Sequence, residues 1–296
     1  PKHPSSNLKA IFGPSSKGEN GKSTNEKFNR KDFCILGNHV DDGAIITPNA
    51  EVAAREKKRF FRKYAGTDEG LLTDFCGVRV QQHSKGIDLD QQAYIEAVAN
   101  EYNCLDCKPV RSPIEKPISQ EDCPEEVNHE VQKKFWKICG QLMYVCTHTR
   151  PDISYAMNQL TRVAHRPHRL HLAQAHHLLR YLVTTRTHKM KFHRATQLEL
   201  DGYNYMDPKN FEGYADSSYA DCKTTAKSSA GHVFFLGKHQ ACVEAIAKMV
   251  PDVGNSSTEN EYITLSRAAQ SGFYIKQFID ELGIFDLPAK YKIYED

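Results

Sequence analysis

The feature that most constrains the fold is an apolar strand pattern at residues 211–221 that ends in a carboxylate. Aromatic residues begin the run, and Asp216 follows them, ahead of small polar residues. A second apolar run at 232–236 lies between Gly231 and Gly237, which is typical of the next strand of an antiparallel pair. The sequence therefore predicts a sheet whose first strand presents an acid near its end.

Further acids follow where folding can bring them to the same sheet edge. The run SSTENE at 256–261 opens a long helical pattern, and the run YKIY at 291–294 has strand character, with Asp296 at its tip. Carboxylates on strand ends and at a helix start can hold divalent metal for phosphodiester hydrolysis. We therefore expect a metal site that combines Asp216, an acid of the helix start and Asp296.

The amino-acid sequences of these segments resemble the ribonuclease H part of copia-type LTR retrotransposon Pol polyproteins. The similar runs are GYADS at 213–217, KSSAGHVF at 227–234 and SSTENEY at 256–262, in the family's order. The resemblance extends from about Cys34 to Asp296. It implies an α+β or α/β chain: a partial reverse-transcriptase palm and thumb, a helical connection, and a ribonuclease H-like mixed sheet with a helix, truncated at the C-terminus.

Resemblance and composition together divide the chain into five segments. Residues 1–31 are rich in Ser, Asn, Lys and Gly without periodicity, and we expect them to be disordered. Prolines among charges mark residues 108–130 as a linker. The other segments are a reverse transcriptase palm/thumb remnant at 32–107, a helical connection at 131–194 and an incomplete ribonuclease H-like domain at 195–296.

Composition restricts the class of protein. The 296 residues, 40% of them hydrophobic, are enough for one large or two ordinary domains. Nine scattered cysteines argue against a secreted disulfide framework and for reduced thiols inside the cell, in a cytoplasmic particle or the nucleus. No apolar run approaches the ~20 residues of a membrane helix, so we expect no membrane partner.

Two apolar runs around the adjacent acids Asp41 and Asp42 indicate a hairpin. The segment resembles the palm hairpin of a reverse transcriptase, whose paired aspartates hold metal ions, although His39 and Asn38 depart from the family's pattern. Acids also favour turns for local reasons, which remains the alternative. Palm chemistry needs a third carboxylate on an earlier strand, and only low-complexity residues precede the hairpin. We therefore expect no polymerisation by this chain alone.

The run TRPD at 149–152 is another copia-type signature with a structural explanation. We expect Thr149 to cap a helix, Pro151 to lie in its first turn and Asp152 to complete a capping box. This interpretation makes the run scaffold and gives Asp152 no catalytic part.

Residues 162–194 are rich in Arg, Lys and His, as expected for a surface that binds the phosphates of a nucleic acid. A solvated helix face is the alternative. Backbone phosphate contacts would give affinity without sequence reading. The candidates are Arg180, Arg186, Lys189 and Lys191. Histidines in this region, and Cys104 with Cys107, lack further ligands at zinc spacing.

In the ribonuclease H mechanism that the resemblance implies, acids hold two divalent ions, Mg²⁺ or Mn²⁺. Asp216 matches the bridging acid, with a turn-forming acid as its structural alternative. Glu259 and Glu261 each follow a capping residue by three positions, so the residues alone leave the helix acid open. The family alignment favours Glu261 as the metal ligand, and Asp296 matches the third acid.

The chain also departs from the family's pattern. The family's fourth acid is missing, and residues 241–255 lack the basic and aromatic strand that the family has there. We expect a fragment of a reverse transcriptase/ribonuclease H polyprotein that, if active, acts on RNA–DNA hybrids by two-metal phosphodiester chemistry. The alternatives are a catalytically inactive nucleic-acid-binding remnant and a relic without a role. The remainder of the polyprotein is a candidate partner.

Overall fold

The computed structural model describes residues 33–40, 42–47, 49–120, 122–193, 211–237, 240–283 and 287–295. These residues fall into two compact units. The first comprises Pro1–Cys76 and Lys276–Leu287, and the second comprises Gly77–Ile275 and Pro288–Asp296. Helices and largely antiparallel sheets alternate along the chain, which confirms the mixed α and β class that the sequence predicts.

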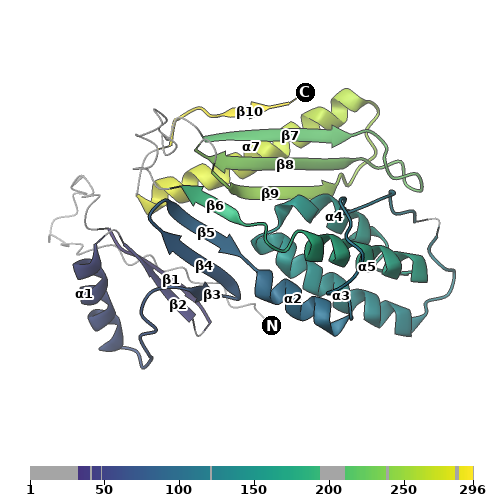
Figure 1. Cartoon of the computed structure of the whole chain (residues 1–296). Helices are drawn as coiled ribbons and strands as arrows, with labels where there is room; N and C mark the ends of the chain where they lie inside the picture. Colours follow the sequence, from purple (N-terminus) through teal and green to yellow (C-terminus); the bar gives the residue numbers. More distant parts are fainter. Residues whose placement is uncertain are drawn as a thin grey trace. The chain divides into compact units, whose positions relative to one another are not determined.

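The first unit contains the predicted hairpin. Strands β1 (Ile35–His39) and β2 (Asp42–Ile46) pair antiparallel, with His39 opposite Asp42 (Figure 1). Helix α1 (Ala50–Phe61) follows, and the Asn49 side chain accepts a hydrogen bond from the backbone N–H of Glu51. The predicted hairpin is therefore confirmed. A two-residue strand, β3 (Asp74–Phe75), follows the helix in the same unit.

The second unit opens with an antiparallel sheet built from distant parts of the chain. Strands β4 (Val78–His83) and β5 (Gly86–Asp90) form a hairpin, and β6 (Met190–His193) pairs with the free edge of β5. Helix α2 (Gln92–Glu101) begins directly after β5, where the Asp90 carboxylate accepts a hydrogen bond from the Gln92 N–H.

Four helices of the second unit share one hydrophobic core. After α2 come α3 (His129–His148), the 3₁₀ turn η1 (Pro151–Ile153), α4 (Ser154–Arg162) and α5 (Arg169–Thr184). The fully buried side chains of this core include Ile95, Phe135, Ile138, Leu142, Met157, Leu160, Leu178 and Leu179. The only tryptophan, Trp136, is half exposed and donates its indole N–H to the Ala164 carbonyl. No described helix is long and apolar enough to cross a membrane.

The expected capping box at 149–152 is wrong. Thr149 donates its hydroxyl to Gln91, 58 residues away, and no side chain caps η1. Arg150, which is 2% exposed, instead forms an ion pair with Asp152 and donates to the carbonyl and hydroxyl oxygens of Thr185. Burial favours a raised pKa for Asp152, but hydrogen bonds and charge from Arg150 outweigh it and lower the pKa. The run is scaffold, held by long-range contacts rather than by a local cap.

The proline-rich segment packs against the helices. Its described residues form no helix or strand before α3 begins at His129, yet Ile118 is buried in the helical core and the Val110 N–H donates to Thr184. Arg180 donates to the Lys108 carbonyl from α5. The segment therefore packs along α5 and is not an extended linker. The predicted division of the chain into domains stays a prediction.

The C-terminal sheet contains four strands and a long helix. In the sheet order β10-β7-β8-β9, strands β7, β8 and β9 are antiparallel and β10 runs parallel to β7 (Figure 1). The elements are β7 (Phe211–Ser218), β8 (Ser229–Leu236), β9 (Cys242–Met249), α7 (Ser257–Leu282) and β10 (Lys292–Tyr294). The segment 241–255, whose sequence departs from the family's pattern, therefore still supplies strand β9.

Helix α7 covers one face of this sheet. His232 of β8 lies 3.0 Å from the Ser271 hydroxyl of α7, and burial lowers the pKa of His232 although nearby Glu244 opposes the shift. On the same face a Cβ at Gly213 would lie 2.4 Å from the Phe234 ring. Only glycine fits at that point, because the aromatic ring fills the space beside the strand.

We predict that Leu178→Ala lowers the free energy of unfolding by about 3 kcal/mol, because it leaves a cavity in the helical core. Leu170→Ala is the matched control on the same helix, since Leu170 is 55% exposed and Leu178 is 1% exposed. Its expected change is within about 0.5 kcal/mol. Urea unfolding followed by circular dichroism measures both, and equal effects would contradict the assignment of this core.

Candidate functional site

The strand register brings two predicted acids to the same end of the C-terminal sheet. Ser218, which ends β7, pairs with Ser229, and Ser229 pairs with Met249, which ends β9. The seven residues 250–256 then lead from β9 into α7. Asp216 lies two residues before the end of β7, and Glu261 lies in the second turn of α7. The end of β7 and the start of α7 therefore lie at the same end of the sheet.

Asp216 and α7 lie on opposite faces of the sheet. Ala215 is buried and pairs with His232, which contacts α7, whereas Asp216 is exposed. Successive side chains of a strand alternate between faces, so the Asp216 side chain points away from the helix. In the described part of the chain, neither Asp216 nor Glu261 forms an ion pair. Both carboxylates are free to take a ligand.

The start of α7 separates the roles of its two glutamates. The Ser256 hydroxyl accepts a hydrogen bond from the Glu259 N–H, and Glu259 accepts from the backbone and side-chain N–H groups of Asn255 at 2.6 and 3.0 Å. Glu259 thus caps the helix, close to the capping box that the sequence predicts. Glu261 is half-buried and takes no part in the cap.

The remaining predicted acids are only partly described. Asp41 and Asp296 lie outside the described residues. Asp42 is exposed and begins β2. Burial, then the charges of Asp42 and Asp74, raise the pKa of Cys76, so these two carboxylates lie near one thiol. Within the described ranges, no cluster of three or more His, Cys, Asp or Glu side chains has the arrangement of a metal site. The carboxylates present are nevertheless the ligand type that Mg²⁺ and Mn²⁺ prefer.

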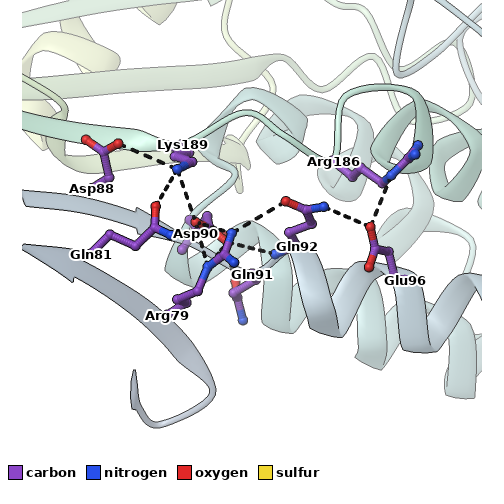
Figure 2. Close-up of polar contacts among 10 residues, drawn as sticks. Arg79, Gln81, Asp88, Asp90, Gln91, Gln92, Glu96, Arg186 and Lys189 are labelled. Atoms are coloured by element: carbon purple, nitrogen blue, oxygen red, sulfur yellow. Dashed lines mark hydrogen bonds and ion pairs between the residues drawn. The ribbon is translucent and has the colours of Figure 1, made fainter. Parts of the chain in front are cut away.

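Two of the predicted phosphate-binding cations are paired with acids of the protein itself. Figure 2 shows Arg186 donating to Glu96 at 3.2 Å and Lys189 lying 3.7 and 3.9 Å from the carboxylates of Asp88 and Asp90. Asp90 is 1% exposed and also receives three hydrogen bonds from Arg79, two at 3.1 Å and one at 2.9 Å. This network joins β4, β5 and α2 to the segment that connects α5 with β6.

Arg180 and Lys191 differ from that pair. Arg180 donates to the Lys108 carbonyl, as described above, and carries no acid partner among the described side chains. Lys191 is exposed in β6, opposite Asp88 in the register of the sheet, and forms no ion pair within the described ranges. Of the four cations, Lys191 is the most available to a ligand.

No local pattern in the sequence indicates these pairings. Glu96 lies 90 positions before Arg186, and Asp88 and Asp90 lie about one hundred positions before Lys189. A local charge count shows only the cations. Their partners become visible once β6 is placed beside β5.

Comparison with known proteins places the chain among transposon proteins. It is 32% identical to an uncharacterized mitochondrial protein of Arabidopsis thaliana over 68% of this chain and 78% of that one. It is 30% identical to a Saccharomyces cerevisiae protein named after transposon Ty5-1, over 77% of this chain and 70% of that one.

A longer relative covers nearly all of the chain. The retrovirus-related Pol polyprotein from the Nicotiana tabacum transposon TNT 1-94 is 28% identical over 92% of this chain, which spans 20% of that polyprotein. No protein-family model matches the chain, and no solved structure matches it. From the similarity over most of its length, the chain belongs to the family of copia-type retrotransposon Pol polyproteins.

Proposed function

We propose that the C-terminal sheet and α7 form a ribonuclease H-like module that hydrolyses the RNA strand of RNA–DNA hybrids. Membership in the Pol polyprotein family supports the proposal. So does the order of elements, in which three strands, a long helix and a further strand follow one another as the sequence resemblance implies.

One observation carries this proposal: the register that brings the end of β7 and the start of α7 to the same sheet edge. Asp216 and Glu261, which are 45 positions apart in the sequence, both belong to that edge. Neither carboxylate is used in an ion pair or helix cap, as the preceding section describes. Asp216 and Glu261 therefore offer unpaired carboxylates at the same end of the sheet, and carboxylates are the ligand type that a divalent ion prefers.

The proposed roles follow from two-metal chemistry. Two divalent ions, Mg²⁺ or Mn²⁺, supply an activated water and a positive charge beside the leaving oxygen when they are bound. In this proposal Asp216, Glu261 and Asp296 would be the residues that hold the ions. Glu259 holds the helix start and thereby fixes the direction from which Glu261 approaches.

The N-terminal hairpin is proposed to descend from the palm of a reverse transcriptase. Asp41 and Asp42 correspond to its paired metal ligands, and the confirmed β1–β2 hairpin supports this correspondence. Because the chain spans a fifth of the tobacco polyprotein, we assign no polymerase activity to it alone.

A second candidate function is nucleic-acid binding without cleavage. The exposed Asp216 side chain points away from α7, which carries Glu261, and this favours a site that does not hold two shared ions. Exposed cations such as Lys191 would then contact backbone phosphates without reading sequence.

We predict that the chain cleaves the RNA strand of a labelled RNA–DNA hybrid when Mg²⁺ or Mn²⁺ is added. Asp216→Asn is expected to abolish cleavage, because an amide oxygen is a much weaker ligand than a carboxylate. Asp106→Asn, which changes an exposed acid in a distant loop, is the matched control and should keep full activity. Gel analysis of the labelled RNA measures all three proteins.

Two outcomes would count against this assignment. Cleavage that survives Asp216→Asn would remove Asp216 from the site. Salt-dependent binding of the hybrid without any cleavage by the unaltered chain would replace the nuclease with the second candidate.

For the cations, we predict that Lys191→Gln weakens hybrid binding and lowers the slope of log affinity against log salt by about 1. Lys189→Gln should chiefly lower stability, because Lys189 already neutralises Asp88 and Asp90. Fluorescence anisotropy over a salt series separates the two effects. Equal loss of affinity in both variants would show that the ion pairs of Lys189 open when nucleic acid binds.

A further inference from the structure

We propose that Arg162 is a positioning residue of the candidate site: its buried ion pair with Asp221 fastens the β7–β8 loop to α4 and fixes the end of the strand that carries Asp216. This inference rests on the proposed function for its consequence. The ion pair itself belongs to the fold and can be tested separately.

The pair is buried and joins distant segments. Arg162 Nη1 lies 3.2 Å from Asp221 Oδ2, and their side chains are 4% and 16% exposed. Charged side chains are seldom buried to this extent unless they are paired. Arg162 ends α4 in the helical part of the unit, whereas Asp221 lies 59 positions later in the loop between β7 and β8. The pair therefore holds α4 and the β7–β8 loop, which are far apart in the sequence, in a fixed position relative to each other.

The hydrogen bonds around the pair lead directly to the candidate site. The Ser229 hydroxyl donates to Asp221 Oδ2 at 2.6 Å, and Arg162 Nη2 donates to the same Ser229 oxygen. Ser229 begins β8 and pairs with Ser218, two residues after Asp216. The contacts of Arg162 thus reach the last pair of the β7–β8 ladder, where the strand that bears Asp216 ends.

Helix α4 contributes one further donor, Gln159, and one acceptor, Asn158, to the hydrogen bonds around the ion pair. Arg162 Nε donates to Asn158 Oδ1 at 2.9 Å, which orients the guanidinium group, and Gln159 Nε2 donates to Asp221 Oδ2 at 3.4 Å. Asn158 and Gln159 are both buried. A carboxylate that receives hydrogen bonds from Arg, Gln and Ser groups has a strongly preferred position.

The loop is also closed internally. The Ala220 N–H donates to the buried Ser228 hydroxyl at 3.0 Å, and the Cys222 N–H donates to the Lys227 carbonyl at 3.0 Å. Gln120 links the loop to the Arg162 carbonyl, since it receives a hydrogen bond from Cys222 Sγ at 3.6 Å and donates at 3.3 Å. The loop is therefore braced internally, and the Arg162–Asp221 pair ties it to α4.

Loss of Arg162 should act locally. It leaves the Asp221 carboxylate buried without its cation, which is strongly unfavourable, and the cheapest relief is for the loop to move into water. The strand end beside it then opens, while the centre of the sheet keeps its hydrogen bonds. Removal of both charges leaves no buried ion and should permit the loop to stay in place.

The experiment compares the full chain with Arg162→Met, with the double variant Arg162→Met/Asp221→Asn, and with Arg186→Met. Arg186 also forms an ion pair, but its side chain is 40% exposed and it contacts Glu96 far from the loop in sequence. Amide hydrogen exchange is measured at Ser217 and Ser218 and, as the internal reference, at Phe234 in the centre of β8. Mn²⁺ affinity is measured by paramagnetic broadening, with Asp216→Asn as the baseline.

Arg162→Met is expected to speed exchange at the strand end by at least about tenfold relative to Phe234, because the strand end opens without global unfolding. Mn²⁺ affinity at Asp216 should fall by at least about tenfold, since its ligand is no longer held in place. The double variant should recover most of the protection, and Arg186→Met should change neither quantity. If Arg162→Met does not fold, Arg162→Lys with the same readouts replaces it.

Exchange that rises equally at Phe234 and at the strand end would overturn the inference, because it would show a purely global contribution to stability. Opening of the strand end without any change in Mn²⁺ affinity would also overturn it. If the unaltered chain binds no Mn²⁺ beyond the Asp216→Asn baseline, the proposed function fails, and the exchange ratio alone then decides whether Arg162 positions the strand.

Discussion

The antiparallel register of β7, β8 and β9 decides which side chains of the C-terminal sheet can act together. It places Ser218, Ser229 and Met249 in one row, and the chain leaves that row to start α7. A shift of one residue would turn Asp216 towards the helix and Ala215 towards solvent, since side chains alternate along a strand. The position of every candidate residue in this sheet therefore depends on the pairing of its strands.

Buried charge is the second constraint on the structure. Arg150, Arg162 and Asp90 are all nearly inaccessible to solvent, and each is matched by an opposite charge: Asp152, Asp221 and Arg79, respectively. Such pairs contribute little net stability when well formed, but they are costly to break. They therefore specify one arrangement of the segments more than they strengthen it. In this chain the Arg162–Asp221 pair joins α4 to a loop of the C-terminal sheet, and the Arg79–Asp90 pair joins β4 to β5.

Local features were predictable from the sequence, and long-range ones were not. The β1–β2 hairpin and the Ser256–Glu259 cap follow from residues within a few positions of one another. The Thr149 cap failed because Gln91, 58 residues away, takes its hydroxyl. The acid partners of Lys189 and Arg162 likewise come from distant segments, so a region read as a free basic face is partly neutralised by the fold.

The central claim is that Asp216 and Glu261 share a divalent ion at one edge of the sheet. A crystal structure of the chain soaked in Mn²⁺, with the anomalous signal of the metal, tests it most directly. The account predicts manganese within about 2.2 Å of a carboxylate oxygen from each residue. Manganese bound to only one of the two carboxylates, or to neither at saturating Mn²⁺, would contradict it.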